Sequence, residues 1–183
     1  MKKCFLAVFI CFNALLIHAQ SVLIKGYIVN EKGDTLKGEA KVNPKKEIDN
    51  YNKVNFKDET GLQKLYKPNK IKAYGFNDEQ YISMDSDGEK KFYKVLATGE
   101  INFYKLGYEA MRMNQLVFEV EYYVSNADDK ELVVIKESKF KKQLSEWMKD
   151  NTEFIEAYGD EKKFNLEKAL EVIKNYNSWK AGK

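Results

Sequence analysis

The sequence contains very few of the side chains on which nucleophilic and metal chemistry usually depend. Its two cysteines are Cys4 and Cys11, and its only histidine is His18. Residues 19–183 therefore have no thiol and no imidazole. This excludes a disulfide framework, Cys/His catalysis and Ser-His-Asp triads, and zinc sites of the usual Cys and His types from that part of the chain. No cofactor or metal is expected.

Only one apolar run is long enough to suggest targeting. Two lysines at positions 2 and 3 precede an apolar run from Cys4 to Ile17, and the small Ala19 follows. This is the layout of a secretory signal peptide, and the run is shorter than the roughly 20 apolar residues of a membrane span. Cys11 lacks the small preceding residue of a lipoprotein signal. We expect removal of residues 1–19 and export to the periplasm or cell exterior, not as a lipoprotein.

Charge of one sign does not dominate the remaining chain. Without the two N-terminal lysines it has 29 basic and 28 acidic side chains, and the signs are interspersed. Arg112 is the only arginine, and arginine is the usual residue for bidentate phosphate and base contacts. Nucleic-acid binding is therefore not expected. About 160 residues fit one domain with a proper core.

Short segments of strand-like alternation recur through residues 20–136. Val22–Asn30 is rich in β-branched and aromatic residues, and Leu36–Val42 alternates apolar with charged positions, as a strand with one wet face does. Gly33 lies in the loop between them and suits a hairpin. The further expected strands are Val54–Phe56, Lys70–Phe76, Gln80–Met84, Lys91–Ala97, Ile101–Leu106, Phe118–Val124 and Leu132–Ile135.

The apolar period changes to a helical one after Ser138. Residues 140–148 and 152–158 suit helices, and Asn165 suits the N-cap of a last helix with an apolar stripe. We expect an α+β fold: a mostly antiparallel sheet (meander, sandwich or open barrel) over 20–136. A pair or trio of helices over 137–183 would pack on the same domain.

Two motifs that suggest chemistry are better explained as local structure. Asp85–Gly88 resembles part of a calcium loop, but Lys94 stands where the bidentate glutamate belongs, so we expect a hairpin turn. Ser138–Lys141 matches the S-x-x-K of serine acyl-enzymes without its partner motifs. We expect Ser138 to be an N-cap.

Glu119 and Glu121 are the candidate pair of catalytic carboxylates. Two residues apart on one strand, their Cβ atoms would be roughly 7 Å apart, which is compatible with an inverting glycosidase. A general acid needs a desolvating pocket to raise its pKa, and nothing nearby in the sequence supplies one. We therefore expect a solvated strand face, with a glycan-acting hydrolase as the alternative.

Aromatic side chains are abundant and often neighbours. All 12 tyrosines follow position 19, and several stand beside another aromatic residue, such as Phe103 with Tyr104 and Tyr122 with Tyr123. Such rows either lie under the C-terminal helices or form a surface that binds a partner or small ligand. The candidate binding residues are Tyr74, Tyr104, Tyr123 and Arg112, the last expected in a loop.

Motifs spread along the chain resemble a family of secreted bacterial proteins of unknown function. The turn Gly33-Asp34-Thr35-Leu36-Lys37-Gly38, the Tyr66, Pro68, Ile71, Ala73, Tyr74 segment, and the Phe92, Val95, Gly99, Ile101, Phe103, Tyr104 segment carry the resemblance, with a Lys-rich tail ending near Tyr176-Asn177. It implies no reaction.

A second resemblance covers only about 20 residues. Gly26, Ile28, Asn30, Gly33, Leu36 and Gly38 fit the start of carboxypeptidase regulatory-like β-sandwich domains, whereas Thr35 and Glu39 do not. The expected function is that of an exported, non-enzymatic envelope protein acting in protein–protein interaction or small-ligand binding.

Overall fold

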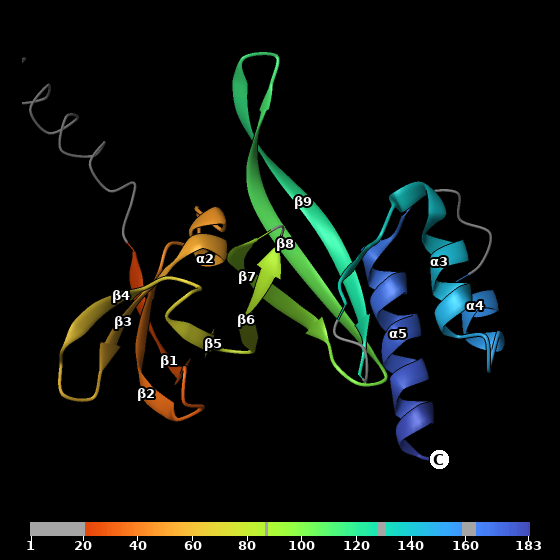
Figure 1. The fold of residues 1–183 in the computed structure, drawn as a ribbon, viewed down its shortest axis with the longest axis horizontal. Helices are drawn as coiled ribbons and strands as arrows, with labels where there is room; N and C mark the ends of the chain where they lie inside the picture. Colours follow the sequence, from red (N-terminus) through yellow and green to blue (C-terminus); the bar gives the residue numbers. More distant parts are fainter. Residues whose placement is uncertain (1–20, 87, 128–130, 159–163) are drawn as a thin grey trace, which may run out of the picture.

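The computed structural model describes residues 21–86, 88–127, 131–158 and 164–183. The predicted signal peptide, residues 1–19, lies outside the described residues. The described part is an antiparallel sheet followed by helices (Figure 1). The strands are β1 Val22–Asn30, β2 Thr35–Val42, β3 Val54–Asp58, β4 Gln63–Tyr66, β5 Ile71–Phe76, β6 Glu79–Ser86, β7 Glu89–Ala97, β8 Ile101–Arg112, β9 Gln115–Asn126 and β10 Val133–Val134.

The described strands form one open sheet in the order β10-β9-β8-β7-β6-β5-β1-β2-β3-β4, with every neighbouring pair antiparallel. This confirms the predicted α+β class with an antiparallel sheet and C-terminal helices, and of the predicted forms the strand order is that of a meander. Strands that follow one another in the sequence are also neighbours in the sheet, with one exception. Strand β5 does not pair with β4 but with β1. The sheet is therefore two meanders joined edge to edge.

The N-terminal meander must curl strongly. In a flat sheet, β4 and β5 would be four strand spacings apart, about 19 Å. The connection between them is short and contains a turn, because the Lys70 N–H donates to the Lys67 carbonyl at 3.0 Å. Only a curled sheet brings the end of β4 close to β5. Ile28, Ala40 and Phe56 are buried inside the curl.

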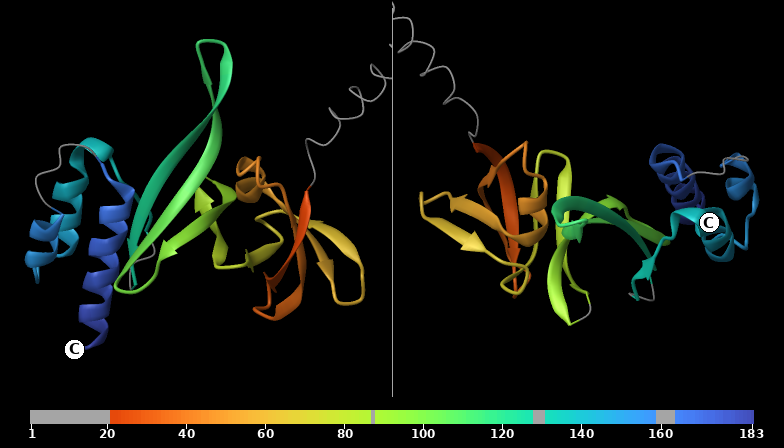
Figure 2. Two further views of the ribbon diagram at one scale, coloured as in Figure 1. Left: turned by 180° about the vertical axis from the view of Figure 1, so that it is seen from behind. Right: turned by 90° about the horizontal axis from the view of Figure 1, so that it is seen from above.

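A second core joins the C-terminal helices to the end of the sheet (Figure 2). The short η2 (Glu137–Lys139) leads into α3 (Phe140–Trp147), α4 (Glu153–Ala157) and the long α5 (Leu166–Ala181). Ile101, Phe103 and Val124 of the sheet pack against apolar residues of these helices. As predicted, the Asn165 side chain caps α5, accepting from the Lys168 N–H at 3.2 Å.

Several sequence-based expectations were wrong in detail. A short helix, α2 (Ile48–Asn52), and strand β4 were not predicted. Strands β8 and β9 are much longer than predicted, and Arg112 ends β8 instead of lying in a loop. Ser138 lies within η2, and α3 begins with no side-chain cap.

None of the helices in the described residues is long and apolar enough to span a membrane.

Candidate functional site

The two faces of the β8–β9 hairpin have different surroundings. Side chains alternate between the faces of a strand, and Tyr104 pairs directly with Tyr123 across the hairpin. These two lie on one face, whereas Phe103 and Tyr122 lie on the face packed against the C-terminal helices. We call the face that carries Tyr104 and Tyr123 the tyrosine face. Each predicted aromatic pair here is thus split between the two sides of the sheet.

A cavity of about 690 Å³ lies on the tyrosine face, between β6 and β10. Three buried tyrosines border it: Tyr93, Tyr104 and Tyr123. The rings of Tyr93 and Tyr123 pack edge to face with centroids 5.2 Å apart. The volume is within the roughly 300–1,000 Å³ range of small-molecule sites. Tyr104 and Tyr123, both predicted binding residues, therefore come together at one cavity.

The cavity has one apolar wall and several polar groups. Ile82, Met84, Leu132 and Val134 supply aliphatic surface. Asn102 and Ser125 supply an amide and a hydroxyl, and Asp85 lies at the rim.

The Tyr104 and Ser125 side chains are hydrogen-bonded to each other. Burial raises the pKa of Tyr104, and the bond to Ser125 opposes that rise only partly. The phenol therefore remains protonated near neutral pH and can serve as a neutral hydrogen-bonding group.

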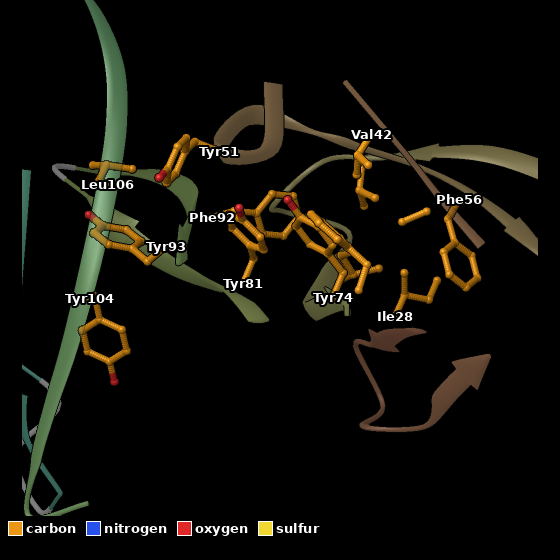
Figure 3. Close-up of a cluster of buried hydrophobic side chains, with 14 of the residues drawn as sticks. Ile28, Val42, Tyr51, Phe56, Tyr74, Tyr81, Phe92, Tyr93, Tyr104 and Leu106 are labelled. Atoms are coloured by element: carbon orange, nitrogen blue, oxygen red, sulfur yellow. The ribbon is translucent and has the colours of Figure 1, made fainter. Parts of the chain in front are cut away.

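Tyr74 belongs to the same hydrophobic core as Tyr104 and Tyr123 but does not line the cavity (Figure 3). Its ring stacks on Tyr81, with centroids 4.8 Å apart and planes 5° from parallel, and it also packs on Phe76. Tyr74 and Phe76 are two residues apart on β5 and so share a face of the sheet. Tyr74 is fully buried and takes no part in a surface with Tyr104 and Tyr123.

Arg112 lies far from the cavity, near the tip of a projecting arm. From Leu106 to Glu121 the strands β8 and β9 pair only with each other among the described strands. We call residues 106–121 the arm, which extends well beyond the rest of the sheet (Figure 1). Met113 and Asn114 form its two-residue turn, both with positive φ, 47° and 62°, as in a type I′ hairpin.

The polar side chains on the tyrosine face of the arm bind one another. Arg112 donates to Glu119 from Nε at 2.6 Å and from Nη2 at 3.3 Å. The Tyr108 hydroxyl lies 3.2 Å from Glu119 and 3.0 Å from Glu121. The Tyr123 hydroxyl donates to Glu121 at 2.6 Å. We call these five residues the arm ladder. Its groups stiffen the arm and leave its polar face satisfied.

The ladder sets the protonation of its members. The hydrogen bond and charge of Arg112, together with Tyr108, lower the pKa of Glu119 despite some desolvation. Burial and the two neighbouring carboxylates raise the pKa of Tyr108 to about 12. A general acid needs its pKa raised, so the environment of Glu119 is the opposite of what the paired-carboxylate hydrolase requires.

Removal of the guanidinium by Arg112→Gln is expected to raise the pKa of Glu119 toward the ordinary glutamate value of about 4.3. Because the folded pKa lies below the unfolded one, the ion pair favours folding above that ordinary value. The benefit is lost as pH falls through the folded pKa. NMR titration of the Glu119 carboxyl carbon measures the shift. Arg112→Lys keeps the positive charge but lacks the two-donor guanidinium, so the pKa of Glu119 should be intermediate. An unchanged Glu119 titration in Arg112→Gln would contradict the role given to Arg112.

The apolar side of the arm was missed by the sequence analysis. Met111, Met113, Leu116 and Phe118 have exposed fractions of 69%, 99%, 61% and 45%. The two methionines that flank Arg112 are the signal of this surface in the sequence, but the sequence predicts only a loop around Arg112.

The segment Asp85–Gly88 fits the predicted hairpin. Strands β6 and β7 pair up to Ser86 and Glu89, and Asp85 accepts from the Gly88 N–H at 2.9 Å. Residue 87 itself lies outside the described residues. Within the described ranges, no three Asp, Glu, His or Cys side chains are grouped as metal ligands would be.

Comparison with protein-family models, with curated proteins and with solved structures finds no match to this chain.

Proposed function

We propose that this chain is an exported, non-enzymatic envelope protein that binds a partner protein through the arm. The observation that carries the proposal is the pronounced exposure of four large apolar side chains, Met111, Met113, Leu116 and Phe118, on a projecting hairpin. Clustered exposed apolar surface is characteristic of interaction sites. The predicted signal peptide supports the exported part of the proposal.

The turn itself supports a binding role for Met113. A left-handed backbone conformation costs a non-glycine residue roughly 1–2 kcal/mol, and Met113 adopts it with φ 47°. The side chain is 99% exposed, so the β8–β9 pairing alone offsets this cost and the side chain gains no contact of its own. Binding to another molecule would supply one.

The arm is arranged as a preorganised ligand. Its tyrosine face is held by the arm ladder, while Met111 and Leu116, which are cross-strand partners, lie on the opposite face. A rigid hairpin loses little conformational entropy on binding. Methionine adapts to irregular apolar surfaces and is common at binding surfaces.

Charge and shape favour a protein groove as the partner site. The arm carries three glutamates, Glu109, Glu119 and Glu121, against the single Arg112, so an anionic bilayer would repel it. A concave apolar groove with a basic rim surrounds both faces of the arm and complements its charge.

The test uses a photo-crosslinking amino acid at Met113 in the native cell. We expect one discrete crosslinked protein, which is then purified and its affinity for the mature chain measured. Leu116→Asp should weaken that affinity at least tenfold, the scale of a hot-spot loss. Leu62→Asp is the matched control, since Leu62 is 65% exposed in the β3–β4 connection, and should leave binding unchanged.

Three results would overturn the proposal. Equal affinity of Leu116→Asp and wild type would show that the arm does not make the contact. A crosslinked product of twice the chain mass would assign the arm to a second copy. Flotation of the purified chain with zwitterionic phosphatidylcholine vesicles, abolished by Leu116→Asp, would assign it to a lipid surface.

A further inference from the structure

We infer that the cavity on the tyrosine face binds a neutral saccharide. This inference is independent of the arm, because the cavity is lined by β6 to β10 near the base of the hairpin and shares none of the four exposed apolar residues. The ligand class follows from the charge, the wall and the hydrogen-bonding groups of the cavity.

The charge of the lining excludes an anion. Among the described lining residues the only charged side chain is Asp85, with no lysine or arginine. Glu121 adds a second carboxylate nearby, bonded to the Tyr123 hydroxyl at 2.6 Å. A carboxylate or phosphate ligand would meet negative charge without a cation to neutralise it.

The arrangement of the tyrosines is unsuitable for an organic cation. An ammonium ligand binds over open aromatic ring faces. Tyr93 is fully buried, and Tyr123 packs against it edge to face at 5.2 Å. These two rings pack against each other and do not form an open aromatic cage. With anions and organic cations excluded, an uncharged ligand remains.

The two kinds of lining surface match the two kinds of surface on a sugar ring. A pyranose has an apolar C–H face and hydroxyl groups around its edge. Ile82, Met84 and Val134 provide the apolar wall. Asn102 and Ser125 provide amide and hydroxyl groups, which hydrogen-bond to hydroxyls.

The experiment titrates the isotope-labelled mature chain with glucose, galactose and N-acetylglucosamine, with glucuronate and choline as charged comparisons. We expect amide shifts confined to residues 82–85, 102–104 and 123–127 for at least one neutral sugar, with a Kd on the order of 1 mM. Glucuronate and choline should bind at least tenfold more weakly.

Two variants link the signal to the cavity. Val134→Trp fills its edge and should weaken binding at least tenfold, whereas Val22→Trp should not. The two valines are equally exposed, 39% and 41%, and only Val134 lines the cavity.

The inference is overturned by any of three results: no localised shift with any neutral sugar, equal binding of glucuronate or choline, or unchanged binding by Val134→Trp whose fold is verified by circular dichroism.

Discussion

Asn177→Asp is expected to destabilise the docking of α5 on the sheet by about 3 kcal/mol at neutral pH, the scale of a lost buried hydrogen-bond network. The Asn177 Oδ1 accepts from the Ile101 N–H at 2.9 Å. Its Nδ2 donates to the carbonyl of Ile101 at 2.8 Å and to that of Thr98 at 3.2 Å. The side chain is only 8% exposed. A carboxylate keeps the first bond but places an oxygen against two carbonyl oxygens.

The pH dependence distinguishes this network from simple packing. Burial and the two carbonyls should raise the pKa of the new carboxyl above its unfolded value of about 3.9. A raised folded pKa means that the penalty is largest above the folded value and disappears below the unfolded one. The deficit of Asn177→Asp relative to wild type should therefore shrink as pH is lowered toward 4.

Urea denaturation from pH 4 to 8 measures both effects. Asn175→Asp is the matched control, because Asn175 is exposed on the same helix and should change stability by no more than about 0.5 kcal/mol. If the loss of stability in Asn177→Asp did not vary with pH, side-chain shape and not hydrogen bonding would be what fixes α5 on the sheet.

The surroundings of Asn177 also explain a glycine in the β7–β8 connection. Gly99 has φ 149°, and a Cβ there would lie 2.6 Å from the Asn177 Cγ. The loop therefore approaches α5 closely enough for its backbone groups to reach the amide. In the sequence, Gly99 stands between two expected strands, but the contact with Asn177, 78 positions away, has no local signal.

The strands of the sheet were predictable because their signal is local. The β-branched and aromatic residues of Val22–Asn30 and the alternation in Leu36–Val42 predict a hairpin, and β1 and β2 pair as expected. The class of fold follows from counting such segments before the helical period begins. Alternation does not reveal which face of a strand is covered by a neighbouring element. It therefore could not distinguish the buried Tyr74 from Tyr104, which lines the cavity.

Helix α2 shows the opposite case, in which tertiary contacts, and not the local sequence, determine that the segment is helical. Its five residues are too few for a helical period and include Asn and Asp, which are poor helix formers. It is held from outside its own sequence: Lys105 donates to the N-cap residue Glu47 at 2.8 Å, and the Tyr74 hydroxyl donates to the Asn50 carbonyl. The hairpin of the arm was not predicted because its turn, Met113-Asn114, contains no glycine and so carries a weak hairpin signal.

Tyr74→Ala is expected to cost about 3–5 kcal/mol of the free energy of unfolding, the range for deleting a buried aromatic ring. Tyr74 is fully buried. Its ring stacks on Tyr81 at 4.8 Å and meets the edge of Phe92 at 4.8 Å. Removal leaves a cavity that rigid neighbouring rings cannot fill. Because native domains are stable by about 5–15 kcal/mol, this one change should bring the chain close to unfolding.

Tyr74→Phe separates the ring from its hydroxyl, which donates to the Asn50 carbonyl of α2 at 2.5 Å. Only that hydrogen bond is lost, so the cost should be about 1 kcal/mol, with faster amide hydrogen exchange confined to α2 and its neighbours. Tyr66→Ala, at a half-buried position on the edge strand β4, is the control and should cost less than Tyr74→Ala. If Tyr74→Phe proved as damaging as Tyr74→Ala, the hydrogen bond to α2, and not the aromatic stack, would be what holds this core together.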